Sequence, residues 1–426
     1  MEAKALGRHV IADLWGVRSN LLNDEFKLRK ICVEAAKRSG STIKGVMFYK
    51  FKPHGVTGVL LLAESHLSIH TWPEHGYASV DIYTCGSNTE PWRAFEYIVE
   101  ALKPSYVEVF EAERGRTDRG DVPPVEGWFV EKYSTYNLHT AGVLKVLYRG
   151  ESRFQRIEVL DLYMYGRSLI IDGKTQSSER FEWMYHEPLV HPAMVTHPEP
   201  SRVLVVGGGE GATAREVLKH GCVDEVHMVD IDAEVVKVCR ELLPSMNEGV
   251  FEDPRFSLII SDGRRFLENL RDDVKYDVII VDVTDPAKGS PSCKLYTKEF
   301  YEAVYKALSP NGVFVTQAAG VIEEEPIVPS VYKTVKTVFP HVRAYKNWVP
   351  DFNDEWCFVI GSKGEDPAAL SAEAVAERLR ERGVNGLKMY SPEVHEFLFR
   401  LPKYFLDLLE GPARIVTDKE PVFVYS

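Results

Sequence analysis

Residues 203–211 have the sequence Val203-Leu204-Val205-Val206-Gly207-Gly208-Gly209-Glu210-Gly211. Four apolar residues suited to a buried strand run directly into glycines, which let the backbone turn tightly and approach a ligand closely. A helical pattern follows at residues 212–220. A strand, a glycine turn and a helix in this order predict the opening unit of a Rossmann-like sheet.

The alternation of strands and helices continues beyond this unit. Strands are predicted at 203–206, 225–229, 278–281 and 312–316, and helices at 212–220, 233–243 and 298–308. Short apolar strands between amphipathic helices predict a doubly wound parallel sheet in an α/β fold. Before residue 201, the pieces 142–148 and 155–163 have strand character without a strong helix. We therefore expect a small β domain in front of the Rossmann-like domain.

The beginning of the chain has a different pattern. Helical spacing is found at 23–39 and 91–102, and strand-like runs at 43–49, 55–63, 67–72 and 77–84. These elements predict a two-layer α/β sandwich. Residues 114–128 hold three glycines and two prolines among charges, which is typical of a linker. We expect domains at 1–115, 129–200 and 201–426, with a linker at 116–128.

The charge of the chain is unevenly distributed. The net charge is −12, and residues 1–115 hold 14 basic and 14 acidic side chains, so the remaining residues carry the whole excess. An acidic chain is a poor nucleic-acid binder and suits cationic ligands. No apolar stretch approaches the roughly 18 residues of a membrane span, and the six cysteines are scattered without metal-site spacing. We expect a cytoplasmic protein with reduced thiols and no metal, membrane or nucleic-acid partner.

Two further motifs follow strands of the predicted sheet. Asp230 ends the second strand, where its carboxylate can bind ribose hydroxyls. Ser261-Asp262-Gly263 follows another strand and can contact the edge of an adenine. Together with the glycine turn they indicate a site for an S-adenosyl nucleoside. The alternative is a structural glycine turn with two helix caps.

Two carboxylates end the strand at 278–281, in Asp282-Val283-Thr284-Asp285-Pro286, where a small-molecule methyltransferase rarely needs them. Upstream, Asp172-Gly173-Lys174-Thr175-Gln176 precedes Tyr185-His186-Glu187. With these motifs, residues 129–426 resemble the polyamine aminopropyltransferases of the spermidine and thermospermine synthase family. The resemblance implies transfer of an aminopropyl group from decarboxylated S-adenosylmethionine to an amine, with release of methylthioadenosine.

The resemblance also implies roles for individual residues. The donor, decarboxylated S-adenosylmethionine, would be held by Gln176, Gly207, Gly209, Asp230, Asp262 and Gly263. Asp282 would take a proton from the acceptor, because an ammonium cannot attack and a carboxylate in a low-dielectric cleft can both bind and deprotonate it. The acceptor site would be lined by Tyr185, His186, Glu210, Asp285 and Gln317.

Several departures from putrescine-using spermidine synthases bear on the acceptor. Those enzymes usually have Asp-Ser-Ser-Asp-Pro, Gly-Gly-Gly-Asp-Gly and Tyr-Pro-Ser-Gly. This chain has Val283 and Thr284 in the first motif, Glu210 in the second, and Trp348-Val349-Pro350-Asp351-Phe352 in place of the third. These differences predict an acceptor longer than putrescine, namely spermidine or agmatine, with putrescine as the alternative.

The densest polar cluster of the first domain is Glu64-Ser65-His66-Leu67-Ser68-Ile69-His70-Thr71-Trp72-Pro73-Glu74. From its pattern alone it could equally be a solvated strand turn. With Leu6-Gly7-Arg8-His9 and Val80-Asp81-Ile82-Tyr83-Thr84-Cys85-Gly86, however, it makes residues 5–115 resemble the small prokaryotic S-adenosylmethionine decarboxylases, which use a self-made pyruvoyl group.

This second resemblance implies that the chain cleaves itself between Glu64 and Ser65. Ser65 would attack the carbonyl of Glu64, and elimination from the resulting ester would leave a pyruvoyl group on the longer fragment. His70 would be the proton-transfer partner of this processing. The pyruvoyl carbonyl would form a Schiff base with the substrate and accept electrons during decarboxylation, and Cys85 would reprotonate the carbanion.

The resemblance implies roles for other residues of the domain, and some of these residues also have a structural alternative. Period two places Cys85 on one strand face with the other polar residues, although a buried structural thiol is the alternative. Phe51 and Trp72 would stack on adenine or belong to the core, and Glu74 would bind the substrate. Thr57 replaces a serine that assists processing in close relatives, so we expect slower cleavage at most.

The expected product of the first domain is the expected donor of the second. We therefore predict a bifunctional enzyme that makes decarboxylated S-adenosylmethionine and then uses it. Two alternatives remain for the first domain, namely decarboxylation of ornithine or arginine, and a catalytically dead domain that regulates the transferase. Both families usually form dimers or tetramers, so we expect a homo-oligomer acting on small-molecule substrates.

Overall fold

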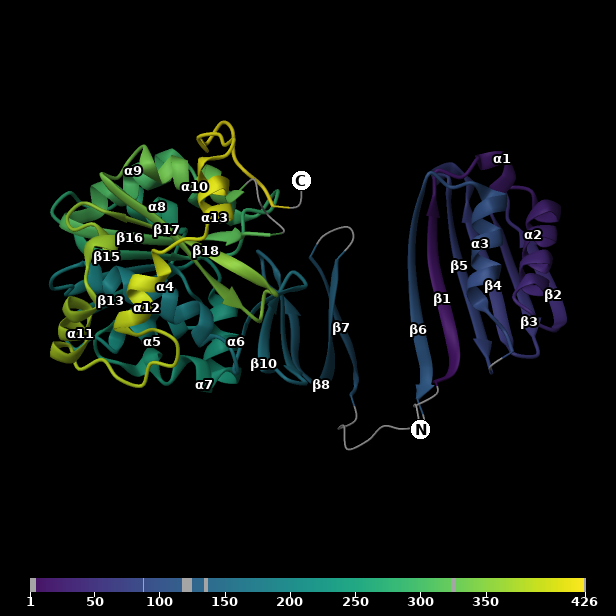
Figure 1. The fold of residues 1–426 in the computed structure, drawn as a ribbon, viewed down its shortest axis with the longest axis horizontal. Helices are drawn as coiled ribbons and strands as arrows, with labels where there is room; N and C mark the ends of the chain where they lie inside the picture. Colours follow the sequence, from purple (N-terminus) through teal and green to yellow (C-terminus); the bar gives the residue numbers. More distant parts are fainter. Residues whose placement is uncertain (1–4, 87, 117–124, 134–136, 323–326, 425–426) are drawn as a thin grey trace. The chain divides into compact units, whose positions relative to one another are not determined.

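A computed structural model of the chain describes residues 5–86, 88–116, 125–133, 137–322 and 327–424. The chain divides into two compact units, Met1–Val122 and Pro123–Ser426 (Figure 1). Most of the predicted linker, residues 117–124, lies outside the described residues. Its two ends lie in strands instead, because pairing of the last strand of the first unit continues to Arg116 and the next strand begins at Gly127.

The first unit confirms the predicted two-layer arrangement. Its described elements are β1 Ala5–Trp15, α1 Ser19–Leu22, α2 Glu25–Arg38, β2 Ile43–Lys50, β3 Val56–Leu62, β4 Ser65–Trp72, the 3-10 turn η1 Pro73–His75, β5 Tyr77–Cys85, α3 Pro91–Leu102 and β6 Tyr106–Arg116. The six strands form one antiparallel sheet in the order β2-β3-β4-β5-β1-β6. The sequence pattern had not indicated β1 and β6, whose residues lie at the two ends of the unit.

The two faces of this sheet are different. Helices α2 and α3 pack on one face of the sheet (Figure 1). On that face, alternate residues such as Leu67 and Ile69 of β4 are fully buried. The opposite face, called the open face below, carries His66, Ser68, His70 and Trp72 from the same strand. Large apolar side chains are exposed on the open face, namely Ile11, Trp15, Met47, Tyr49, Val59, Leu61, Trp72 and Phe110.

The second unit begins with the predicted small β structure. Its strands are β7 Gly127–Lys132, β8 Leu138–Glu151, β9 Arg156–Leu162, β10 Gly166–Ile171 and β11 Lys174–Ser178, in one antiparallel sheet ordered β11-β10-β9-β8-β7. Helix α4, Trp183–Thr196, follows within the range expected for this domain but packs on the sheet described next. The sequence did not reveal α4 because it is buried on all sides from Tyr185 to Thr196 and therefore has no polar face.

A seven-stranded sheet forms the centre of the second unit. Its strands are β12 Arg202–Gly207, β13 Glu225–Asp230, β14 Phe256–Ile260, β15 Tyr276–Asp282, β16 Leu308–Gly320, β17 His341–Val349 and β18 Asp354–Ser362, ordered β14-β13-β12-β15-β16-β18-β17. The first five are parallel, which confirms the Rossmann-like prediction. β18 and β17 are antiparallel additions that the sequence pattern had not indicated.

Helices cover both faces of this sheet. They are α5 Ala212–Leu218, α6 Ala233–Leu242, α7 Pro244–Asn247, α8 Gly263–Glu268, α9 Lys298–Ala307, α10 Ile327–Lys336, α11 Ala372–Glu381, α12 Pro392–Leu398 and α13 Lys403–Glu410, with 3-10 turns η2 Val250–Glu252, η3 Pro291–Leu295 and η4 Pro367–Ala369. Figure 1 shows α8, α9 and α10 on one side of the strands and α5 and α12 on the other, in agreement with two separate apolar cores. This arrangement is doubly wound.

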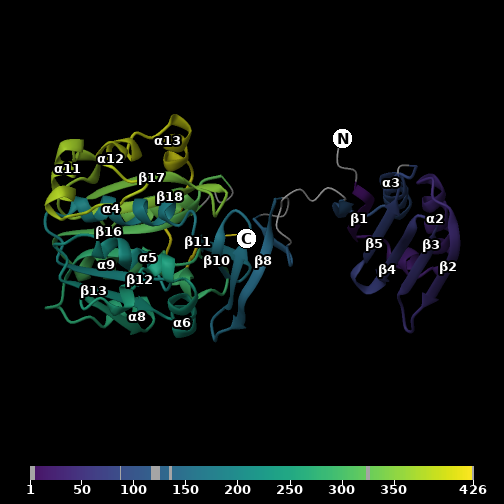
Figure 2. The same ribbon diagram turned by 90° about the horizontal axis from the view of Figure 1, so that it is seen from below.

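The small sheet is attached to the Rossmann-like part by a third apolar cluster. Ile157 and Val159 of β9 and Leu169 of β10 pack against Val235 and Cys239 of α6. Figure 2 shows β10 and β11 beside the Rossmann-like part, so the small sheet lies next to the carboxyl ends of β12, β13 and β15. All six cysteines are free thiols. Among the described residues, none of the helices is both long and apolar enough to cross a membrane.

Candidate active sites

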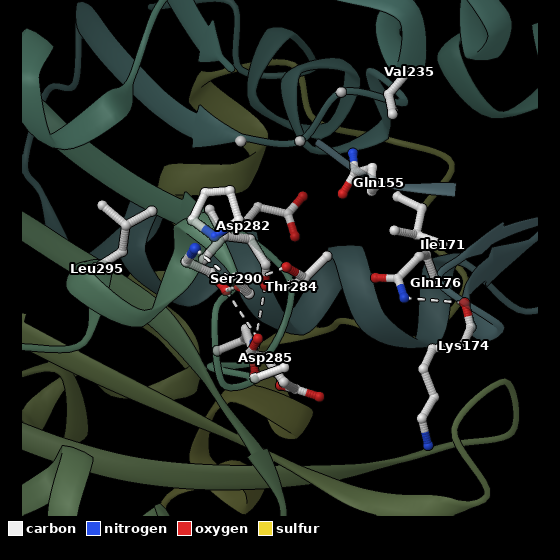
Figure 3. A pocket seen from close by; sticks show the side chains of 18 of the residues that line it. Gln155, Ile171, Lys174, Gln176, Val235, Asp282, Thr284, Asp285, Ser290 and Leu295 are labelled. Atoms are coloured by element: carbon white, nitrogen blue, oxygen red, sulfur yellow. Dashed lines mark hydrogen bonds between the residues drawn. The ribbon is translucent and has the colours of Figure 1, made fainter. Parts of the chain in front are cut away.

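A cavity of about 290 Å³ lies in the second unit, where the carboxyl ends of the parallel strands face the small sheet. Every residue that the sequence assigned to donor or acceptor binding in this unit lines it. These residues are Gln176, Tyr185, His186, Gly207, Gly209, Glu210, Asp230, Asp262, Gly263, Asp282, Asp285 and Gln317. Figure 3 shows that Gln176 enters from one side of the cavity and that Asp282 and Asp285 lie on another.

The glycine turn after β12 is required by close packing. Gly207 has φ +82°, and a Cβ there would lie 2.0 Å from the carbonyl oxygen of Asp282. The amide of Gly208 donates to that same carbonyl over 2.8 Å. The turn is therefore fastened to the end of β15, which places Asp282 beside the glycines.

The two carboxylates expected to bind the nucleoside have different surroundings. Asp230 ends β13, and burial raises its pKa to about 6. Asp262 caps α8 by accepting from the amide of Arg265 over 3.0 Å and also lines the cavity. Asp262 thus caps a helix, as the alternative interpretation expected, and it also lines the cavity.

Asp282 lies at the end of β15 with both carboxylate oxygens occupied. The hydroxyl of Tyr185 donates to Oδ1 over 2.9 Å, and the hydroxyl of Thr213 donates to Oδ2 over 2.6 Å. Enclosure in the cavity raises the pKa of Asp282 above its usual range, although the Thr213 and Tyr185 bonds and the charge of His186 oppose the rise. A carboxylate that is oriented and made more basic is suited to accept a proton.

Asp285 lies three residues beyond the strand end and is held by Gln317 of β16. Gln317 Nε2 donates to Asp285 Oδ1 over 2.9 Å, and the indole nitrogen of Trp356 donates to Gln317 Oε1 over 3.1 Å. Burial raises the pKa of Asp285 to about 6, with the Gln317 bond opposing the rise. Near neutral pH this carboxylate is therefore mostly charged and can bind an ammonium group.

Glu210 and His186 form a charged pair at the wall of the cavity. His186 Nε2 lies 2.7 Å from Glu210 Oε1, and the hydroxyl of Ser177 also donates to Glu210. His186 Nδ1 faces Glu182, which in turn accepts from Arg215. The pKa of His186 is raised well above its usual value because these carboxylates outweigh the opposing effect of burial.

Several residues of the cavity were missed by sequence reasoning. Gln155 precedes β9, lines the cavity and donates to Asp232 Oδ2 over 3.0 Å (Figure 3). Its place at the start of a predicted strand was the available signal. Other residues line the cavity from β7, β11, α8, β18 and two turns, and no role was predicted for any of them from the sequence. They are Glu131, Tyr133, Lys174, Thr175, Arg264, Phe352, Asp354 and Trp356.

The first unit brings Glu64, Ser65 and Cys85 together at the start of β4. The carbonyl oxygen of Glu64 accepts from the amide of Cys85 over 2.8 Å, which polarises the carbonyl expected to be attacked. Ser65 has φ +148°, a backbone conformation that L-residues rarely adopt and that stores strain at this peptide bond. Cys85 is half-buried and lies on the open face, so it is not a buried core thiol.

The structure does not bring His70 to Ser65 within one chain. Both residues lie on β4, and five residues of extended strand separate them by about 16 Å. His70 Nδ1 is instead 3.0 Å from the hydroxyl of Thr57 on β3. Because an extended strand cannot fold back on itself, His70 cannot exchange a proton with Ser65 of the same chain.

The expected substrate residues of the first unit lie near His70 rather than near Ser65. Phe51 and Trp72 are 47% and 41% exposed, so the alternative that they belong to the core is wrong. Glu74 follows β4 and its Oε2 lies 3.0 Å from His54 Nε2. A set of aromatic, acidic and imidazole side chains thus lies at the opposite end of β4 from the Glu64–Ser65 bond.

Comparison with known proteins identifies a family for each unit. The spermine/spermidine synthase domain model matches residues 182–370, the spermidine synthase tetramerisation domain model matches 127–179, and the S-adenosylmethionine decarboxylase model matches 8–115. The chain is 40% identical over 295 residues to the polyamine aminopropyltransferase of Sulfolobus acidocaldarius, covering 69% of this chain and 97% of that protein.

Two further relatives show the same likeness. Polyamine aminopropyltransferase 2 of Hyperthermus butylicus is 43% identical over 282 residues, which are 66% of this chain and 92% of that protein. The crystal structure of a spermidine synthase in complex with the transition-state analogue AdoDATO is 33% identical with a TM-score of 0.63, and the match covers 69% of this chain and 98% of that one. The chain belongs to the polyamine aminopropyltransferases and joins such an enzyme, in its second unit, to an S-adenosylmethionine decarboxylase in its first.

Proposed function

We propose that the protein cleaves itself between Glu64 and Ser65, decarboxylates S-adenosylmethionine, and transfers the aminopropyl group of the product to spermidine or agmatine. The observation that carries the proposal is the convergence of the residues expected from the sequence on one cavity, with Asp282 at the end of its central strand. The first unit supplies the donor that this cavity is built to bind.

The surroundings of Ser65 support self-cleavage. A strained residue follows a carbonyl that accepts a hydrogen bond from Cys85, and both features favour attack of the Ser65 hydroxyl on that carbonyl. The pyruvoyl group left on Ser65 would supply an electron-accepting carbonyl for decarboxylation. Cys85, whose amide contacts the Glu64 carbonyl, is placed to return a proton near that position.

We further propose that a complete decarboxylase site contains residues from two copies of the chain. His70 is about 16 Å from Ser65 along β4, beyond the reach of any side chain. The open face carries large exposed apolar residues, which mark an interaction surface. Two copies related by a twofold axis would cover this face and bring His70, Phe51, Trp72 and Glu74 of one copy towards Ser65 of the other.

In the second unit, Asp282 takes a proton from the ammonium group of the acceptor. The freed nitrogen lone pair attacks the aminopropyl carbon of the donor, the carbon–sulfur bond breaks, and its electrons stay on the sulfur of methylthioadenosine. Tyr185 and Thr213 orient the carboxylate through their hydroxyls. Gln155, Asp230 and Asp262 lie on the side of the cavity proposed for the nucleoside.

The acidic lining supports an acceptor with several cationic groups. Besides Asp282, the carboxylates of Glu131, Glu210, Asp285 and Asp354 line the same cavity. Together they give the cavity a negative lining that attracts the cationic nitrogens of a long amine, and enclosure strengthens such attraction. Because these carboxylates are spread over the cavity, they favour the more widely spaced cationic groups of spermidine or agmatine over those of the shorter putrescine.

Product analysis tests the proposal. The purified chain is incubated with S-adenosylmethionine and one of putrescine, agmatine or spermidine, and products are identified by mass spectrometry. We expect a Met1–Glu64 fragment, carbon dioxide, methylthioadenosine and the aminopropylated form of spermidine or agmatine. A product from putrescine alone would contradict the acceptor proposal. Release of carbon dioxide from ornithine or arginine, but not from S-adenosylmethionine, would contradict the decarboxylase proposal.

A further inference from the structure

We propose that His66 is the base that takes the hydroxyl proton of Ser65 when the chain cleaves itself. His66 Nδ1 lies 3.1 Å from Ser65 Oγ, within hydrogen-bond reach. The inference rests on the proposed self-cleavage and assigns its first proton transfer to a residue of the same chain.

The other imidazoles of this part of the open face are placed differently. His70 is about 16 Å away along β4 and lies against Thr57. The ring of His9 on β1 is 6.0 Å from the ring of His66, and its Nε2 faces Asp81 at 3.5 Å. Within the described part of the first unit, His66 is thus the imidazole that contacts Ser65 Oγ.

The ring of His66 is oriented by its neighbours across the strands. His66 pairs with Tyr83 on β5 and with Leu61 on β3. Its ring lies edge-on to His9 at an interplanar angle of 76° and to Tyr83 at 70°, with centroids 6.0 Å apart in both cases. These contacts hold Nδ1 towards Ser65, as a base must be held before the attack.

The first covalent step then balances within the chain. As Ser65 Oγ forms a bond to the carbonyl carbon of Glu64, its proton passes to His66 Nδ1, and the carbonyl electrons move onto the oxygen that accepts from Cys85. When the intermediate collapses, the bond between the Glu64 carbon and the Ser65 nitrogen breaks, and the nitrogen receives the proton from His66. The product is an ester between Glu64 and the Ser65 side chain, with a free amine on Ser65.

The later steps need a second proton transfer, which this proposal leaves to His70 of another copy. Loss of the Ser65 Cα proton and cleavage of the Cβ–Oγ bond release Glu64 as a carboxylate. Water then replaces the nitrogen, which departs as ammonia, and the pyruvoyl group remains. His66 therefore acts in forming the ester and His70 in breaking it down. Trapping the ester separates the two roles.

The test uses freshly made full-length chain and follows cleavage by denaturing mass spectrometry, with and without hydroxylamine, which cuts esters but not amides. His66→Gln keeps a polar side chain but removes the base, and His75→Gln at an exposed position is the matched control. We expect His66→Gln to slow cleavage by about 100-fold or more, with no hydroxylamine-sensitive bond at Glu64–Ser65. Added imidazole should accelerate cleavage of His66→Ala, which also shows that this variant is folded.

Several results would overturn the inference. These are cleavage of His66→Gln at the rate of the control, a hydroxylamine-sensitive ester that accumulates in that variant, or no effect of imidazole on His66→Ala. An unmodified chain that never cleaves would instead refute the proposed self-processing itself. The two failures are thus distinguished by the behaviour of the unmodified chain.

Discussion

His186 is held between two carboxylates, with Nε2 2.7 Å from Glu210 Oε1 and Nδ1 2.9 Å from Glu182 Oε2. Arg215 donates to Glu182 from the far side over 2.8 Å. The result is an alternating row of negative and positive groups that ends at Glu210, inside the cavity. This row fixes the position of Glu210 and keeps His186 charged.

Replacing His186 with glutamine is expected to destabilise the second unit by about 3 kcal/mol at pH 7, because two buried carboxylates lose their shared cation. The pKa of His186 is raised above its unfolded value, so its stabilisation is fully present below about pH 6.5 and is lost as pH rises through the folded pKa. The difference in unfolding free energy between the variant and the unmodified chain should therefore shrink at alkaline pH. Denaturation at a series of pH values measures it, with His341→Gln at an exposed position as control.

Replacing Asp282 with asparagine is expected to lower aminopropyl transfer by about 100- to 10,000-fold, because the acceptor loses its base. Asparagine keeps the size of the side chain and contact with Tyr185 and Thr213. Transfer is measured with supplied decarboxylated S-adenosylmethionine, and decarboxylation in a separate assay should be unchanged. Asp272→Asn, at a position exposed to solvent, serves as the control. Loss of both activities would show that the two units do not act independently.

The pH dependence of transfer is expected to report Asp285. Its pKa is raised to about 6 by burial, so kcat/KM for the acceptor should fall as pH decreases through 6 and the carboxylate loses its charge. Because the pKa is raised, the folded state holds this proton more tightly than the unfolded state does. The free energy of unfolding should therefore decline as pH rises from about 4 to 6. In Asp285→Asn, the pH at which kcat/KM falls on the acidic side should change. If that pH is unchanged, the fall is due to another group.

Much of the second unit could be predicted because its signals are local. The apolar run of β12 and its glycines lie together in the sequence. Asp230 and Asp282 are the last residues of strands, and Asp262 caps a helix. Because the carboxyl ends of parallel strands lie at the same edge of the sheet, these carboxylates were expected to lie close together. Gln155 and Trp356 could not be placed in this way, because they enter the cavity from a separate sheet and from the antiparallel strand β18.

The first unit shows a different limit of sequence reasoning. Ser65 and His70 belong to one motif, and closeness in sequence suggested one site. In an extended strand five residues are about 16 Å, so the motif is divided between two ends of β4. The contact between Ser65 and His66 depends on the local backbone at Ser65, where φ is +148°, and strand patterning does not contain that information.

Co-expression of two inactive variants tests whether the decarboxylase site is shared between copies. Ser65→Ala alone cannot form the pyruvoyl group, and His70→Ala alone is expected to stop before it. In a mixed dimer, Ser65 of the His70→Ala chain can meet His70 of the Ser65→Ala chain. Co-expression should then restore about a quarter of the pyruvoyl content of the unmodified protein, since half of the dimers are mixed and each holds one complete site.

The control for this experiment is the double variant, Ser65→Ala with His70→Ala, co-expressed with the unmodified chain. In each mixed dimer, one copy then lacks both residues. If the site is shared between copies, no mixed dimer has a complete site. If the site is contained in one chain, each mixed dimer keeps half of the activity of the unmodified dimer. Pyruvoyl content is measured by denaturing mass spectrometry and decarboxylation by release of labelled carbon dioxide. If Ser65→Ala and His70→Ala fail to complement, and the double variant leaves its partner chain active, then each site is built from a single chain.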